Sequence, residues 1–120
     1  MEAMVQSHWL EIAPAGGVTV VRFHLPRLIE TRVVQALGEQ LAHQADQLGR
    51  RRFVLNLQGV AAVSSALLGK LVRFQDQVTA AGGRVVLCGL EPDVHDVLRT
   101  TSLTELLPVY PDEPQAVRSC

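Results

Sequence analysis

The segment Arg52–Gly69, RFVLNLQGVAAVSSALLG, decides how the rest of the chain is interpreted. It contains an apolar strand, a short connection with Gly59, a pair of serines, and the start of an amphipathic helix. The pair, Ser64 and Ser65, falls where the chain enters the helix. Backbone N–H groups are unpaired there, and the helix dipole favours negative charge. A hydroxyl at this point can cap the helix or carry a phosphate.

Length and composition are typical of one soluble domain. The chain has 120 residues, of which 48% are hydrophobic, enough to bury a core without disulfides or metal. Its net charge of -1 does not indicate a nucleic-acid partner. We therefore expect a single domain over residues 1–120, with its core at about 8–110 and a short tail over 111–120.

The two cysteines and the N-terminal segment indicate in which cellular compartment the protein is expected. Cys88 and Cys120 show neither metal-ligand spacing nor a disulfide framework, which is typical of a reducing cytoplasm. The N-terminal residues do not have the pattern of a signal peptide, and no apolar run reaches membrane-spanning length. The sequence predicts a cytoplasmic protein without direct membrane insertion.

The first part of the chain predicts a β-hairpin. Strands are expected over His8–Ile12 and Val18–Leu25, with proline and glycines between them as turn signals. Alternation gives the second strand one better core face, which carries Thr19, Val21, Phe23 and Leu25.

A helix is expected next. Thr31 is positioned to cap it, and it runs to about Leu48, where Gly49 closes it. We interpret the arginines at 50–52 as cations near a helix C-terminus rather than as an anion site. The apolar stripe of this helix is Val34, Leu37, Leu41, Ala45 and Leu48.

Strands and helices then alternate. The predicted strands are Phe53–Leu57, Arg84–Cys88 and Val109–Tyr110. One helix is expected over Ser65–Ala81, where Gly82 and Gly83 end it, and another is expected to start at Pro92. We expect a short turn or helix over Leu103–Leu107 and a short helix or tail over 111–120. The resulting order, β-β-α-β-α-β-α-β, predicts an α/β domain. We expect a mixed, mostly parallel sheet of about four or five strands with helices packed on it.

The helical pattern also predicts which side chains face the core. In the helix over residues 65–81, Phe74 is expected at the margin of the buried face. The residues expected inside are Leu67, Leu68, Leu71, Val72, Gln75 and Val78 in this helix, and Val94, Val97 and Leu98 in the next.

Groups that could carry catalysis are scarce. The four histidines are scattered without metal-ligand spacing, and no carboxylate pair suggests acid–base work. The glycines at 82–83 precede a strand rather than open a helix, so they do not predict a phosphate-binding loop. The sequence predicts a non-enzyme with no catalytic residues or metal ligands.

The serine pair leaves two interpretations open. In the first, Ser64 caps the helix and Ser65 is a small first-turn residue. In the second, one hydroxyl is a phosphoacceptor, Ser65 in preference to Ser64. A phosphate would add about -1.5 to -2 charges and repel a docked partner without unfolding the helix. Gly69, Val72, Arg73 and Asp76 lie on the same side of the helix as Ser65. Because Gly69 has no side chain, it either lets a partner approach closely or packs against the sheet.

Two segments resemble a known family. The stretch VLNLQGVAAVSSALLGKLVRF, residues 54–74, resembles the signature of STAS domains, the anti-sigma-factor antagonist fold. The stretch GGRVVLCGLEPDVHDVLRTTSLTELLPVY, residues 82–110, is similar to the rest of that family. The resemblance covers the chain from about residue 8 to residue 110.

In this resemblance, Ser65 stands at the phosphorylatable serine of the family. Ser64 and Asn56 each stand where the family usually has Asp, and Ala66 and Leu67 occupy the next positions, where a glycine is lost. Leu68 and Gly69 match the pattern.

The resemblance implies a regulatory protein-binding module. Such a domain binds an anti-sigma factor, often an ATP-dependent serine protein kinase, and phosphorylation of its serine ends the interaction. The nucleotide belongs to the partner, so this chain needs no cofactor. An alternative is an unphosphorylated scaffold, or an accessory subunit of a stress-signalling or transporter complex; the oligomeric state, a homodimer included, stays open. The implied partner-binding residues are Asn56, Gly59, Ser64, Ser65, Gly69 and Arg73.

Overall fold

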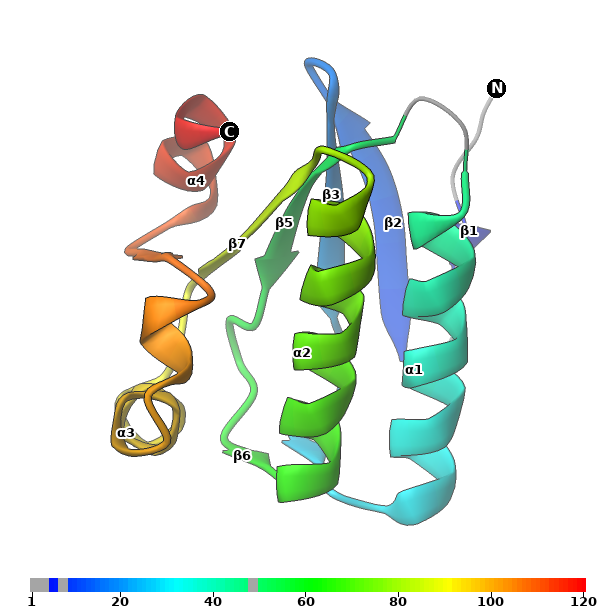
Figure 1. Cartoon of the computed structure of the whole chain (residues 1–120). Coiled ribbons are helices and arrows are strands. Elements are labelled where there is room, and N and C mark those ends of the chain that lie inside the picture. The colour runs from blue at the N-terminus through cyan, green and yellow to red at the C-terminus, as the bar shows by residue number, and fades with distance from the viewer. Residues whose placement is uncertain (1–4, 7–8, 48–49) are drawn as a thin grey trace.

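A six-stranded mixed sheet forms the centre of the structure, a computed structural model that describes residues 5–6, 9–47 and 50–120 (Figure 1). Across the sheet the strands are β1 (Val5–Gln6), β2 (Leu10–Ala15), β3 (Val18–Phe23), β5 (Arg52–Asn56), β7 (Arg84–Cys88) and β8 (Val109–Tyr110). Strands β1, β2 and β3 are antiparallel, and β3, β5, β7 and β8 are parallel. The α/β class with a mixed, mostly parallel sheet is confirmed, although the described sheet has one strand more than the upper expectation.

The predicted hairpin is confirmed with shifted ends. Strand β2 begins at Leu10 and extends to Ala15, while His8 lies outside the described residues. Strand β3 ends at Phe23, two residues earlier than expected. A second, two-stranded parallel sheet of β4 (Arg27–Leu28) and β6 (Ala62–Val63) was not predicted, because two-residue strands leave no periodic signal.

Two long helices, α1 (Thr31–Ala45) and α2 (Ser65–Ala80), lie side by side on one face of the sheet (Figure 1). The prediction that Thr31 caps α1 is wrong: Thr31 is its first helical residue, and Glu30 takes the cap position without a side-chain hydrogen bond. The helix ends at Ala45, earlier than expected, and the predicted stop at Leu48 and Gly49 falls outside the described residues.

The remaining helices follow the second half of the sheet. They are α3 (Pro92–Thr100), the short 3₁₀ helix η1 (Leu103–Glu105) and α4 (Glu113–Ser119). Pro92 opens α3 as predicted, and the tail over residues 111–120 forms a helix rather than an extended end.

The central strands of the sheet, β3, β5 and β7, are largely buried on both faces. Val21 and Phe23 belong to the larger core under α1 and α2, as expected. Val18 and Val20, assigned to the poorer face, are also buried, because Ala116 of α4 packs with them on the opposite side. The sequence pattern of β3 could not predict that α4 packs on this face, because α4 lies at the far end of the chain.

Two side chains depart from the predicted helix faces. Phe74 is 1% exposed and meets Phe53 edge to face, with ring centroids 5.0 Å apart, so its placement at the margin was wrong. Val97, expected inside, is 40% exposed. The buried stripe of α2 follows Leu67, Leu71, Phe74 and Val78, which leaves Val72 and Gln75 half-buried.

The arginines at 50–52 contact three different parts of the chain. Arg51 donates to the carbonyl of Ala81, so a cation does lie at a helix C-terminus, that of α2. Arg50 donates to the buried Gln44 side chain, and Arg52 to the carbonyl of Cys120 at 3.5 Å.

Candidate protein-binding site

Ser64 caps α2, as one interpretation of the sequence predicted. Its backbone is extended, and its hydroxyl accepts a hydrogen bond of 3.1 Å from the Leu67 N–H. Its own N–H donates to the carbonyl of Leu28 in β4 at 3.1 Å. These two bonds fix the direction in which α2 leaves the small sheet.

Ser65 differs from its neighbour. It is the first residue of α2 and is exposed, whereas Ser64 is half-buried. Within the described ranges, no group forms a hydrogen bond with the Ser65 hydroxyl. The hydroxyl therefore faces solvent at the positive end of a 16-residue helix. Its role as phosphoacceptor stays a prediction, with Ser64 the less accessible alternative.

Gly69 and Arg73 are exposed along the same helix. A Cβ built on Gly69 meets no heavy atom within 4 Å, so close packing against the sheet, one of its two interpretations, is wrong. Arg73 and Lys70 line a shallow hollow of about 160 Å³ between α1 and α2. The side of α2 that leads away from Ser65 is thus open to a partner.

The connection between β5 and β6 reaches toward α3. Gly59 has a φ of +88°, which an L side chain rarely adopts, and its N–H donates to Glu91 Oε2 at 3.2 Å. An open hollow of about 470 Å³ lies beside it, lined also by Ala61, Pro92 and Asp93. Gly59 therefore sits on the α3 side of this end of the molecule, and Ser65 on the α2 side.

Ile29 is a residue that the sequence interpretation missed. It is 40% exposed and directly follows Leu28, the residue whose carbonyl holds the Ser64 N–H. A single apolar residue in a short connection has no periodic neighbours, so nothing in the sequence told whether it was buried. Its position beside the helix start makes it a candidate apolar anchor for a partner.

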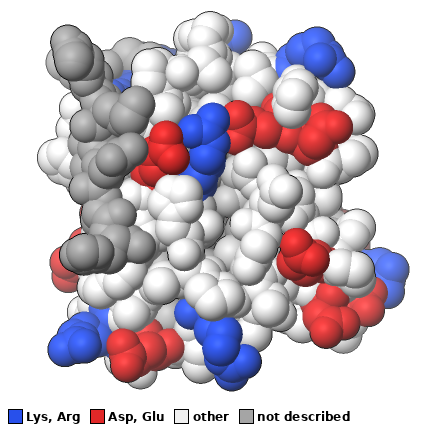
Figure 2. Space-filling view, turned by 180° about the vertical axis from the view of Figure 1, so that it is seen from behind, with Lys and Arg blue, Asp and Glu red and all other residues white. Residues whose placement is uncertain are grey.

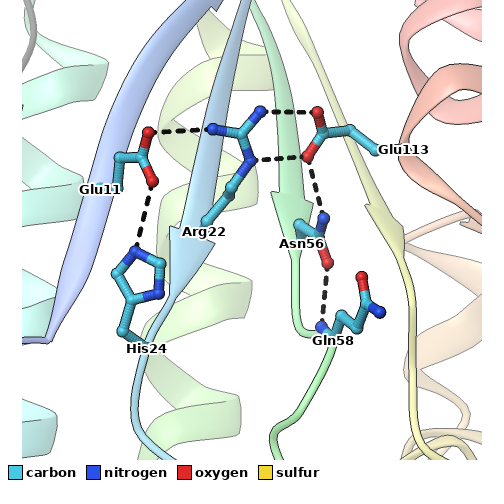
Figure 3. Close-up of polar contacts among 6 residues, drawn as sticks. All are labelled: Glu11, Arg22, His24, Asn56, Gln58 and Glu113. Carbon is cyan, nitrogen blue, oxygen red and sulfur yellow. Dashed lines mark hydrogen bonds and ion pairs between the residues drawn. The ribbon is translucent and has the colours of Figure 1, made fainter.

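Asn56 lies apart from the serine pair, on the face of the sheet that α4 covers (Figure 3). Its Nδ2 donates to Glu113 Oε1 at 2.9 Å, and its Oδ1 accepts from the Gln58 N–H at 2.9 Å. The structure places it in no contact with Ser65. Its role in partner binding stays a prediction.

Asn56 belongs to a row of polar contacts across that face. Arg22 binds Glu113 through two hydrogen bonds, of 2.9 and 2.7 Å, and Glu11 at 3.0 Å; His24 lies 3.3 Å from Glu11 (Figure 3). Seen from behind, charged groups of both signs alternate on a largely uncharged surface (Figure 2). The hydrogen bonds from Arg22 hold the pKa of Glu113 below its ordinary value.

The described residues contain no group of three or more side chains suited to hold a metal ion. Among them there is also no helix of sufficient length and hydropathy to cross a membrane.

A family model for the STAS domain matches residues 11–116 of the chain. The chain belongs to the STAS domain family. An anti-sigma factor antagonist by name, BtrV of Bordetella bronchiseptica, is 32% identical over 85 residues, which is 71% of this chain and 72% of BtrV.

Solved structures agree with this fold. A STAS domain protein of Planctomyces limnophilus superposes with a TM-score of 0.82 at 22% identity, over 92% of this STAS domain and 95% of that chain. SpoIIAA of Bacillus, in its phosphorylated form, gives a TM-score of 0.71 at 15% identity, over 92% and 99% of the two chains. This STAS domain is a member of the anti-sigma factor antagonist family, which is regulatory and not typically enzymatic.

Proposed function

We propose that this STAS domain binds an anti-sigma factor at the start of α2 and is switched by phosphorylation of Ser65. The observation that carries the proposal is the contrast between the two serines. Ser64 is engaged as the helix cap, and Ser65 is exposed beside it with a free hydroxyl in the described structure. A kinase can reach Ser65 without breaking a bond that α2 needs.

Phosphorylation there would act on the surface rather than on the fold. The phosphate would bring about -1.5 to -2 charges to a helix N-terminus, where the dipole tolerates them. The Ser64 cap and the Ser64–Leu28 bond stay intact. A partner covering Ser65 would have to desolvate that charge, so binding weakens while the domain stays folded.

The names of relatives support the same function. BtrV is named as an anti-sigma factor antagonist, and SpoIIAA, which shares the fold, has been solved in a phosphorylated form. The proposed partner is accordingly an anti-sigma factor that is itself a serine protein kinase, and the phosphate donor belongs to that partner.

The proposed docking surface is defined by Ser65, Gly69, Arg73, Gly59 and Ile29. Gly69 leaves space for close approach, and Arg73 supplies an exposed cation two turns from Ser65. Ile29 gives the surface an apolar element at the start of the helix. An apolar anchor beside a polar, modifiable group is the composition expected of a reversible protein interface.

Phosphopeptide analysis of the protein from its native cells tests the switch directly. A phosphate on Ser65 within residues 61–70, absent from Ser64, is the expected result. The kinase is then sought by capture on the wild-type domain and assayed with ATP against wild type, Ser65→Ala and Ser64→Ala. Transfer to wild type and to Ser64→Ala, but not to Ser65→Ala, is expected. A peptide unmodified under growth and stress alike would instead favour the unphosphorylated scaffold.

The docking surface has a matched test of its own. Ile29 and Val97 are both 40% exposed, but only Ile29 adjoins the start of α2. Ile29→Ser should reduce capture of the kinase about tenfold or more, as loss of an interface anchor does. Val97→Ser should leave capture unchanged, and equal effects of the two variants would contradict this location.

A further inference from the structure

Asn56, at the carboxyl end of β5, joins two parts of the chain that are distant in sequence. Its Nδ2 binds Glu113, the first residue of α4, and its Oδ1 binds the N–H of Gln58 in the β5–β6 loop (Figure 3). One side chain therefore contacts both the C-terminal helix and the loop that carries Gly59.

Gly89 leaves the space that the Asn56 side chain occupies. A Cβ on Gly89 would lie 2.9 Å from Asn56 Oδ1 and 3.2 Å from the Gln58 nitrogen. Gly89 also has a φ of +69°. The Leu57 N–H donates to the Cys88 carbonyl at 3.0 Å, so the start of the loop is held against the end of β7. A larger residue at 89 would force the Asn56 side chain or the start of the loop to shift.

The chemistry at residue 56 requires an amide. Glu113 Oε1 accepts from Asn56 Nδ2 and from Arg22 Nε, both at 2.9 Å, so residue 56 must present a donor to it. Residue 56 must also present an acceptor to Gln58. A carboxylate could serve Gln58 but would place an acceptor against the ionised Glu113. Asn meets both demands, at a position where the STAS pattern usually carries Asp.

The loop held in this way leads to the proposed docking surface. After Gln58, Gly59 binds Glu91, Val60 is fully buried, and the chain enters β6 and then Ser64. We propose that Asn56 and Glu113 are positioning residues through which α4 holds the β5–β6 loop in the arrangement that the docking surface needs. The link to docking rests on the proposed function, whereas the link between α4 and the loop does not.

Amide hydrogen exchange of the full chain, followed by NMR, tests that link without a partner. In Asn56→Asp, repulsion from Glu113 should turn the new carboxylate away, and the Gln58 amide should exchange about two- to tenfold faster, as for the loss of one hydrogen bond. Exchange at Val86, in the middle of β7, reports global stability and serves as the reference. Adding Glu113→Gln supplies a donor, so the double variant should recover most of the protection at Gln58.

Glu105→Gln, at an exposed acid of η1, is the control and should leave Gln58 unchanged. Exchange at Gln58 that is unaltered in Asn56→Asp, or that does not recover in the double variant, would overturn the proposal. Should Asn56→Asp fail to fold, Glu113→Gln alone must shift the Gln58 amide resonance, and no shift would overturn it equally. If Ser65 is never phosphorylated, the proposed function is wrong, but the results expected at the Gln58 amide do not change.

Discussion

The Ser64 hydroxyl accepts the N–H of Leu67 at 3.1 Å, while the hydroxyl of the adjacent Ser65 is exposed and has no hydrogen-bond partner in the described structure. Two neighbouring residues of one type thus have different environments. Ser64 contributes to the stability of α2, and Ser65 is free to contribute to recognition. This division allows stability and binding to be altered separately.

Ser64→Ala should lower the free energy of unfolding by about 1 kcal/mol, because the Leu67 N–H loses its cap. Ser65→Ala should change it by less than about 0.5 kcal/mol, as for an exposed residue without partners. Urea denaturation of both variants measures the difference. Equal losses in the two variants would mean that the cap is shared.

Gly69→Ala should have opposite effects on stability and on binding. The new Cβ meets nothing in the free domain, and alanine favours the helix, so the free energy of unfolding should rise by about 0.5–1 kcal/mol. The same methyl group should hinder a partner that approaches α2, so capture of the kinase should weaken. A stabilised variant that captures the kinase as well as wild type would place the interface elsewhere.

Acid should destabilise the protein through Glu113. Hydrogen bonds from Arg22 and Asn56 favour its ionised form, so its pKa is lower in the folded state than in the unfolded state. Its stabilising contribution is therefore complete above the unfolded pKa of about 4.3 and is lost as the pH falls through the folded pKa.

The measurement is urea unfolding of wild type and Glu113→Gln between neutral pH and acid. The difference in unfolding free energy between them should shrink as the pH falls below about 5, because wild-type Glu113 then also loses its charge. Arg22 keeps its partner Glu11 in both proteins, and His24 lies against Glu11 in both, so the two proteins differ at Glu113 alone. A difference that is constant with pH would exclude this role of Glu113.

The two cysteines should react at different rates in the folded protein. Cys88 is fully buried, and burial raises its pKa to about 12. Burial also raises the pKa of Cys120, but Arg84 and Arg52 oppose the rise and the residue is partly exposed. At pH 8, Ellman's reagent should modify one thiol of the native protein promptly and the second only on unfolding. Cys120→Ser should remove the fast phase, and survival of that phase would show that Cys88 is accessible.

Much of this architecture was predictable because it follows from patterns among residues that are close in sequence. The turn signals near residues 14–17 predicted the hairpin, and the apolar runs of β5 and β7 predicted buried parallel strands. The serine pair before an amphipathic stretch predicted the start of α2 and its cap. Errors arose where the sequence did not show which side of a helix is buried. Phe74 is an example, because the neighbouring apolar residues were compatible with a position either inside or at the margin of the buried face.

The sequence by itself determined the α/β class, the place where α2 begins and the likeness to STAS domains, because each depends on patterns of residues close together in the chain. It left the capping role of Ser64 as one of two interpretations, between which the structure decided. The tertiary structure alone decided that Val18 and Val20 are buried under α4, that Gly69 faces open space and that Asn56 pairs with Glu113. Each of these follows from contacts between segments far apart in sequence, and no local periodicity specifies which distant segment will cover a face or meet a side chain.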